Sequence, residues 1–191
     1  MIKYKTHLAV LILMIALVSA TQVTNYEFTT EQNIEAQGCQ VWQGSNYFPE
    51  SLASCTARAD MTHDPSLDYD DNLYTQDTQI TGHKNFHFFI LKEVPRTANH
   101  LDFAYVSYNS EDRVPDVHEV YIRNFQTRRW ELVNSANVGM LDTANLDSSV
   151  TLNRDYIQNR QVWILSTGNL INSDYFSARV TYETPQIVVT N

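Results

Sequence analysis

The sequence predicts an all-β protein, an antiparallel β-sandwich of about eight strands, and three observations carry this prediction. Short apolar runs rich in Val, Ile, Phe, Tyr and Trp recur along the chain between turn-forming clusters. The periodicity of an amphipathic helix is hard to find. Apolar and polar side chains alternate regularly over 174–182, so that one face of this strand belongs to the core and the other to solvent.

The other elements follow the same reasoning. The stretch Phe103–Val106 is apolar on both faces, which is typical of a strand in the middle of a sandwich. Two strand-like runs flank the polar turn 126–128, which predicts a hairpin with Trp130 packed inward. Residues 155–158 are expected to form one helical turn. The predicted strands are 23–29, 86–91, 100–108, 119–125, 129–133, 149–152, 161–166 and 174–182.

Residues 1–20 are predicted to be a cleavable signal peptide. Lys3 and Lys5 precede an apolar run from Leu8 to Val18, and the small residues Ser19 and Ala20 offer a cleavage point. The alternative is an uncleaved membrane anchor, but this run is little more than half of the about 20 apolar residues that a spanning helix needs. We therefore expect a secreted, extracellular protein with no stable membrane span, built as a single sandwich domain over 21–191.

The negative charge of the chain excludes some classes of binding partner. Loss of the two lysines with the signal peptide lowers the formal net charge from -9 to -11. Nucleic acids and anionic lipid surfaces are bound by basic faces, so an acidic domain of this kind is expected to bind neither. Partners are instead expected to be an extracellular glycan or a cell-surface protein.

Cys39 and Cys55 are the two cysteines of the chain, and they lie within the region that looks least regular, about 30–80. In an oxidising compartment an isolated pair tends to form a disulfide, which would staple this region and stabilise the fold by roughly 3 kcal/mol. Two free buried thiols or a metal site are the alternatives.

An acidic segment at 63–75 is a candidate calcium site. Asp68, Asp70 and Asn72 stand at alternate positions, where a loop can turn several hard oxygen ligands toward one Ca²⁺. An EF-hand is excluded, because its glycine position holds Leu73 and its glutamate position holds Gln79. A solvated acidic turn without metal is the alternative.

The chain resembles the galactose-binding-like domains, that is, discoidin or jelly-roll carbohydrate-binding sandwiches. The resemblance rests on the acidic loop 70–75 ahead of alternating strands, followed by the runs 121–125 and 129–132, and it spans roughly 60–183. It implies a jelly-roll-like fold, a structural Ca²⁺ in the acidic loop, and a tryptophan on a core hairpin. It also implies that loops at one end hold a sugar through aromatic stacking and hydrogen bonds. The candidates in the irregular region are Trp42, Tyr47, Phe48, Tyr69 and Tyr74.

Packing of these rings onto the sandwich is the alternative to a sugar site. No nucleophile elbow, phosphate loop or dinucleotide fingerprint occurs, and no catalytic residue is assigned. Three functions follow in order: a secreted non-catalytic module that binds glycan or a cell-surface component, a structural or adhesive extracellular protein, and a small secreted hydrolase. The first predicts an exposed aromatic and polar cluster. The second predicts exposed strand edges and concentration-dependent assembly.

Overall fold

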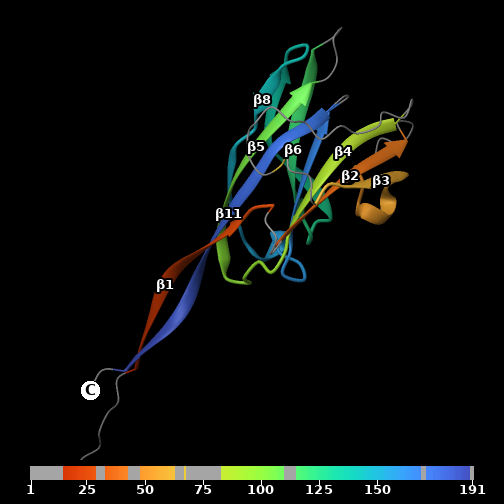
Figure 1. The fold of residues 1–191 in the computed structure, drawn as a ribbon. Helices are drawn as coiled ribbons and strands as arrows, with labels where there is room; N and C mark the ends of the chain where they lie inside the picture. Colours follow the sequence, from red (N-terminus) through yellow and green to blue (C-terminus); the bar gives the residue numbers. More distant parts are fainter. Residues whose placement is uncertain are drawn as a thin grey trace, which may run out of the picture.

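The fold is described from a computed structural model that places residues 15–28, 33–42, 48–62, 67, 83–109, 115–168 and 171–189. Eleven strands and two short 3-10 helices lie in these ranges (Figure 1). The strands are β1 (Ile15–Tyr26), β2 (Ile34–Trp42), β3 (Ala57–Asp60), β4 (His83–Leu91), β5 (Ala98–Asn109), β6 (Asp116–Asn124), β7 (Arg129–Val138), β8 (Thr143–Asn145), β9 (Ser148–Thr151), β10 (Val162–Gly168) and β11 (Ile171–Val189); the helices are η1 (Leu52–Ser54) and η3 (Arg154–Tyr156).

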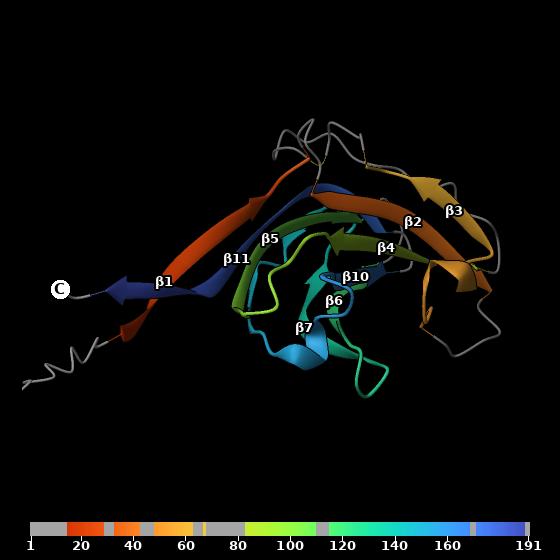
Figure 2. The ribbon, with the colours of Figure 1, turned by 90° about the horizontal axis from the view of Figure 1, so that it is seen from below.

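The strands form two antiparallel sheets, which confirms the predicted β-sandwich. One sheet has the order β1-β11-β5-β8, with β9 also paired to β5, and the other has the order β3-β2-β4-β10-β6-β7. Figure 2 shows the two sheets from below. The predicted hairpin is formed by β6 and β7, and the predicted helical turn is η3. None of the helices in the described part of the chain is long and apolar enough to cross a bilayer.

The structure has eleven strands rather than about eight, because β2, β3 and β8 do not stand out in the sequence. β2 alternates buried and half-buried residues, but glutamines and Gly38 interrupt its apolar pattern. β3 is a short edge strand with mostly exposed side chains, and β8 has three residues. Strand propensity depends on the neighbours that a strand packs against, so pairing rather than composition creates these elements. Two of the three lie within 30–80, the region described as irregular from the sequence.

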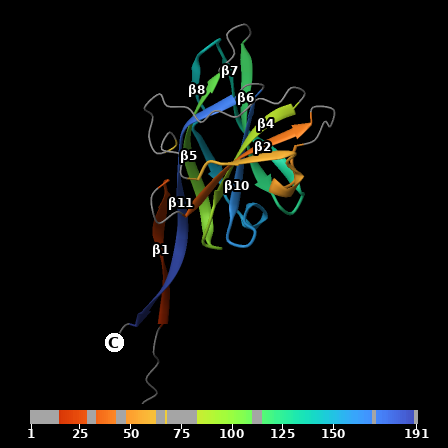
Figure 3. The same ribbon diagram turned by 45° about the vertical axis from the view of Figure 1, so that its right-hand side comes forward.

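β1 and the far half of β11 project from the sandwich as a two-stranded ribbon (Figure 1, Figure 3). Their register runs from Ile15 opposite Val189 to Tyr26 opposite Ala178. Pairing of β11 with β5 ends where Tyr182 meets Ala98, so beyond that point β11 pairs with β1 alone. Ile15–Ala20, the end of the predicted signal peptide, is the part of β1 that pairs with Thr184–Val189.

The main core lies between the sheets. Phe89 of β4 stacks on Phe176 of β11 with ring centroids 4.1 Å apart, and Leu101 and Val180 are fully buried beside them. The alternation predicted for β11 is confirmed: Phe176, Ala178 and Val180 face the core, whereas Arg179 is exposed. Burial of such side chains is the largest favourable contribution to folding.

A second apolar cluster lies on the other face of the six-stranded sheet. Cys39, Phe86, Phe88 and Leu165 are buried there beneath the segment 48–55, which the predicted disulfide between Cys39 and Cys55 ties to β2. The Cα atoms of the pair are 5.3 Å apart, within the range that a disulfide spans.

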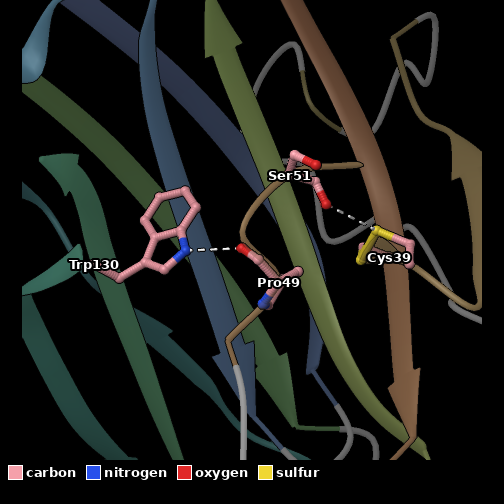
Figure 4. Close-up of a disulfide and its surroundings, with 5 residues drawn as sticks. Cys39, Pro49, Ser51 and Trp130 are labelled. Carbon is pink, nitrogen blue, oxygen red and sulfur yellow. Dashed lines mark hydrogen bonds between the residues drawn. A yellow bond between two sulfur atoms is a disulfide. The ribbon is translucent and has the colours of Figure 1, made fainter. Parts of the chain in front are cut away.

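Trp130 belongs to this second cluster and not to the space between the sheets. Its ring packs edge-on against Phe88, and its Nε1 donates a hydrogen bond of 2.9 Å to the carbonyl oxygen of Pro49 (Figure 4). The prediction that Trp130 packs inward is therefore wrong: Trp130 packs on the outer face of the six-stranded sheet and not between the sheets. The segment 48–55 covers this face, so a large apolar ring can be buried on the side of the sheet away from the main core.

Candidate functional site

β5 carries serine, histidine and aspartate clusters on both of its faces, and the first of them is buried. Ser107 of β5 points between the sheets, where its Oγ lies 2.8 Å from Nδ1 of His118. The other ring nitrogen, Nε2, lies 3.3 Å from Oδ2 of Asp116, an ion-pair distance without hydrogen-bond geometry. We call Ser107, His118 and Asp116 the buried cluster.

More polar side chains continue the buried cluster across the same end of the sandwich. The hydroxyl of Tyr105 lies 2.7 Å from Oγ of Ser166 and 3.0 Å from Oγ of Ser173, and Ser173 also contacts Nδ1 of His87. All four side chains are fully buried. The interior is thus mostly apolar, and side-chain hydrogen bonds join the two sheets at these polar positions.

The buried cluster has the residue types of a catalytic triad, but its histidine is turned the other way: Nδ1 faces the serine, whereas Nε2 lies beside the aspartate without a hydrogen bond. In addition, Ser107 and His118 have no exposed surface. A nucleophile must reach a substrate carbonyl, and a hydroxyl sealed between two sheets cannot. The geometry therefore assigns this cluster to the fold.

A second cluster lies on the outer face of the same strand. His100 and Asp102 are two residues apart on β5, and Ser149 of β9 is the cross-strand neighbour of Asp102. The Ser149 hydroxyl donates to Oδ1 of Asp102 at 2.8 Å and lies 2.9 Å from Nε2 of His100, which itself lies 3.0 Å from Asp102 Oδ1. We call these three residues the exposed cluster, because solvent reaches all of them.

The exposed cluster is not arranged as a proton relay either. A single nitrogen of His100, Nε2, faces both the serine and the aspartate, whereas a relay needs the two nitrogens on different partners. The hydrogen bond from Ser149 stabilises the carboxylate and lowers the pKa of Asp102, with a further contribution from His100. Asp102 is thereby held as an oriented anion at the surface.

A groove of about 590 Å³ runs over the outer face of the five-stranded sheet and includes part of the exposed cluster. Its floor contains Ala104 and Ser177, which are cross-strand neighbours on β5 and β11. Ala104 and Ser177 have small side chains, which leave room above this pair on the sheet. The lining residues are Asn25, Glu27, Asp102, Phe103, Ala104, Asp147, Ser148, Ser149, Ser177, Ala178 and Arg179.

The groove presents both signs of charge. Glu27, Asp102 and Asp147 supply acceptor oxygens, whereas Arg179 supplies a fork of donors. Tyr175 stands on the same face of β11, and its hydroxyl donates to Oγ of Ser177 at 2.9 Å. A flat ring beside convergent donors and acceptors can hold a polyhydroxylated ligand.

Most of the site residues predicted from the sequence fall outside the described residues. This is so for Tyr47, Tyr69 and Tyr74, and for the three calcium ligands Asp68, Asp70 and Asn72. Within the described ranges, no group of three or more His, Cys, Asp or Glu side chains is placed to hold a metal ion.

Two aromatic candidates are described, and they differ. Trp42 ends β2, and 58% of it is exposed, so it is available to a ligand. Phe48 is instead packed on Phe86 and Tyr121, with ring centroids 5.8 and 4.7 Å away, and it helps to bury the second cluster. The alternative of packing onto the sandwich therefore describes Phe48.

Sequence reasoning did not find the exposed cluster or the groove. The alternation of His100, Asp102 and Ala104 along a predicted strand places them on one face, which is a usable signal. Ser149 and Ser177 come from strands far away in the chain, and their position beside β5 depends on the pairing of strands.

Comparison with known proteins gives a distant likeness. No protein-family model and no curated protein matches the sequence. The similar solved structures include a xylan-binding CBM22 domain, with a TM-score of 0.36 at 13% identity over 62% of this chain and 82% of that chain. The CBM22-1 and GH10 modules of a Clostridium thermocellum xylanase, complexed with xylohexaose, give 0.36 at 8% identity over 63% of this chain. The epithelial adhesin 6 A domain from Candida glabrata gives 0.32 at 12% identity, over 81% of this chain and 79% of that chain.

This chain spans 26% of the xylanase modules. Carbohydrate-binding modules, the class that the sequence resemblance names, are thus among the solved structures to which the chain is similar.

Proposed function

We propose that the protein is a secreted, non-catalytic module that binds a glycan in the groove over β5 and β11. The observation that carries this proposal is the hollow above Ala104 and Ser177, flanked by oriented carboxylates and by Arg179. Paired carboxylate and guanidinium groups match the hydroxyls of a sugar, which act as donors and acceptors at once. A volume of about 590 Å³ is within the range of small-ligand sites, about 300–1,000 Å³.

Two features support binding rather than catalysis. Ser107 and His118 are sealed from solvent, and His100 directs one nitrogen at both of its partners. Secretion is supported by the basic and apolar pattern of residues 1–20. We also propose a structural calcium ion bound by Asp68, Asp70 and Asn72. Glycan binding in the groove does not depend on this ion.

A glycan-array screen of the secreted protein tests the proposal, followed by titration of each hit with variants. Arg179→Ala and Asp102→Asn are expected to weaken binding by about tenfold each, which corresponds to one charge-assisted hydrogen bond. Trp42→Ala tests the competing site, because it removes an exposed aromatic candidate from the other sheet. Loss of binding in Trp42→Ala with intact binding in both groove variants would place the site among the loop aromatics and refute the groove.

The screen is run with and without Ca²⁺. An increase in melting temperature on adding Ca²⁺ would support the predicted site in the acidic loop. An absence of hits in both conditions would contradict the binding function.

A structural or adhesive role is the second candidate, and the β1–β11 ribbon favours it. β1 is an edge strand of 12 residues whose outer edge is unpaired among the described residues. Cleavage after Ala20 would also remove the partner of Thr184–Val189 and leave that segment with two open edges. This role predicts that the secreted protein, beginning at Thr21, elutes as larger species with rising concentration in size-exclusion chromatography, and that deletion of 184–191 abolishes the effect.

A further inference from the structure

A pocket of about 410 Å³ lies at the end of the sandwich where β4 leads into β5 and η3 leads into β10. Its lining residues are Arg96, Arg154, Ile157, Gln158, Asn159 and Arg160, none of which is acidic. We call it the arginine pocket. Three of the 13 Lys and Arg residues of the chain thus lie around one pocket. The pocket is positively charged, whereas the chain as a whole has a net charge of -9.

Each of the three arginines is held on a well-defined turn. Arg96 lies within the turn closed by the hydrogen bond from the Ala98 amide to the Pro95 carbonyl, at 3.0 Å. Arg154 begins η3, which the side chain of Asn153 caps by accepting from the Asp155 amide at 2.7 Å. Rigid supports of this kind reduce the entropy lost when a ligand is bound.

Arg160 occupies a position that costs backbone energy. The Gln158 and Gln161 amides and carbonyls pair with each other, and the two residues between them, Asn159 and Arg160, have φ angles of 52° and 61°. Both central residues of a two-residue hairpin turn are therefore in the left-handed region, where glycine would cost less. Replacement of Arg160 by glycine is therefore expected to relieve this backbone strain.

The positive charge around the pocket is only partly neutralised. In the described part of the chain, Arg160 lies near Glu93, whose exposed carboxylate is 3.9 Å away and whose backbone carbonyl accepts a hydrogen bond of 3.3 Å from the guanidinium. Among the described residues, no carboxylate lies within ion-pair distance of Arg96 or Arg154. Asp155, the neighbour of Arg154, is instead oriented toward Gln126, whose amide nitrogen donates to both carboxylate oxygens at 2.9 and 3.1 Å.

We propose that the arginine pocket is a second binding site, specific for an acidic saccharide that carries a carboxylate or sulfate group. Guanidinium groups bind such oxyanions through two parallel hydrogen bonds, and the amides of Gln158 and Asn159 can pair with the neighbouring hydroxyls. Ile157 adds an apolar wall for the face of a sugar ring. Only the choice of a saccharide rests on the proposed function; the anion specificity rests on the arginines alone.

Isothermal titration with a galacturonic acid trimer, a sulfated disaccharide and a neutral galactose trimer tests this site in the full secreted chain. Arg96→Ala combined with Arg154→Ala is expected to weaken binding of the acidic probes by at least about tenfold. Binding of the acidic probes should also fall as the salt concentration rises. Arg58→Ala combined with Arg129→Ala is the control, because it removes the same charge from exposed positions on β3 and β7.

Arg160→Gly is a second, independent variant. It removes the guanidinium and suits the left-handed backbone, so we expect weaker binding of the acidic probes with an unfolding midpoint that is unchanged or raised. Equal weakening in the control pair would overturn the site, because net charge alone would then explain binding. Binding of inorganic sulfate with no affinity for either acidic saccharide would overturn the assignment to saccharides.

Binding of the neutral trimer is monitored in the same experiments. If the neutral trimer binds and responds to Arg179→Ala while neither acidic probe binds, the arginine pocket fails and the proposed function stands. If acidic probes bind and respond to the pocket variants while the groove variants change nothing, the groove fails and the arginine pocket stands.

Discussion

The buried cluster and the exposed cluster contain the same three residue types and share β5, yet they serve different ends. Ser107, on the inner face, has no contact with solvent, and its partner His118 is sealed with it. Asp102, on the outer face, has a side chain that is 48% exposed and lines a groove. Residue types alone therefore do not identify a functional site. Burial decides whether such a group is sealed within the fold or stands open to solvent.

The largest difference between the clusters is expected on removal of the histidines. His118→Ala leaves a cavity and strips Ser107 and Asp116 of a buried partner, so it should lower the free energy of unfolding by about 3–5 kcal/mol. His100→Ala, on the exposed face, should change it by no more than about 0.5 kcal/mol. Urea denaturation of both variants measures the two values, and equal losses would contradict the assignment of the buried cluster to the fold.

A smaller effect is expected where the backbone approaches the buried cluster. A Cβ atom at Gly168 would lie 2.6 Å from Cδ2 of His118 and 2.8 Å from Oδ2 of Asp116. Both neighbours are held in place by burial, so Gly168→Ala should destabilise the protein by about 1–3 kcal/mol.

Gly139→Ala is the matched glycine variant. The three atoms nearest to its Cβ would all belong to the exposed side chain of Asp142, the closest at 3.2 Å, and that side chain can move away. We expect a change of about 0.5 kcal/mol or less by urea denaturation. A similar cost at both glycines would show that the packing around His118 is looser than described.

Removal of the two serines should give a smaller difference in the free energy of unfolding than removal of the two histidines. Ser107→Ala removes a buried hydrogen bond and leaves Nδ1 of His118 without its partner, which costs about 1–2 kcal/mol. Ser149→Ala removes an exposed hydroxyl that water can replace, so its effect on the free energy of unfolding should stay within about 0.5 kcal/mol. If Ser149→Ala proves the more costly of the two, burial is not what distinguishes the clusters.

The sequence predicts the sandwich and the eight strongest strands because apolar alternation is a local signal. It also predicts the disulfide, since the export expected from residues 1–20 and a single pair of cysteines leave few alternatives. β2 and the exposed cluster depend on partners distant in the chain, such as Ser149 opposite Asp102, and no local pattern encodes that pairing. The polar side chains of the interior are not predicted for a related reason. Ser166 and Ser173 face inward and break the apolar alternation, and their hydrogen-bond partner, Tyr105, lies on another strand.

The most subtle expected difference is the response of the exposed cluster to pH. The hydrogen bond from Ser149 is the largest cause that lowers the pKa of Asp102 below its ordinary value of 3.8, followed by the hydrogen bond and charge of His100. A carboxyl with a lowered pKa stabilises the folded state above about pH 4, and this contribution is lost as the pH falls through the folded-state value. Its size is small, because the exposed side chain is screened by solvent.

The substitution Ser149→Ala should therefore return the pKa of Asp102 toward 3.8, as measured by an NMR titration of the carboxyl carbon. His100→Ala should raise this pKa by a smaller amount, because its hydrogen bond is the lesser cause. A pKa that is unchanged in Ser149→Ala would mean that the serine does not orient the carboxylate. Asp102 would then line the groove as a carboxylate that Ser149 does not orient, and the effect of Asp102→Asn could no longer be assigned to an oriented acceptor.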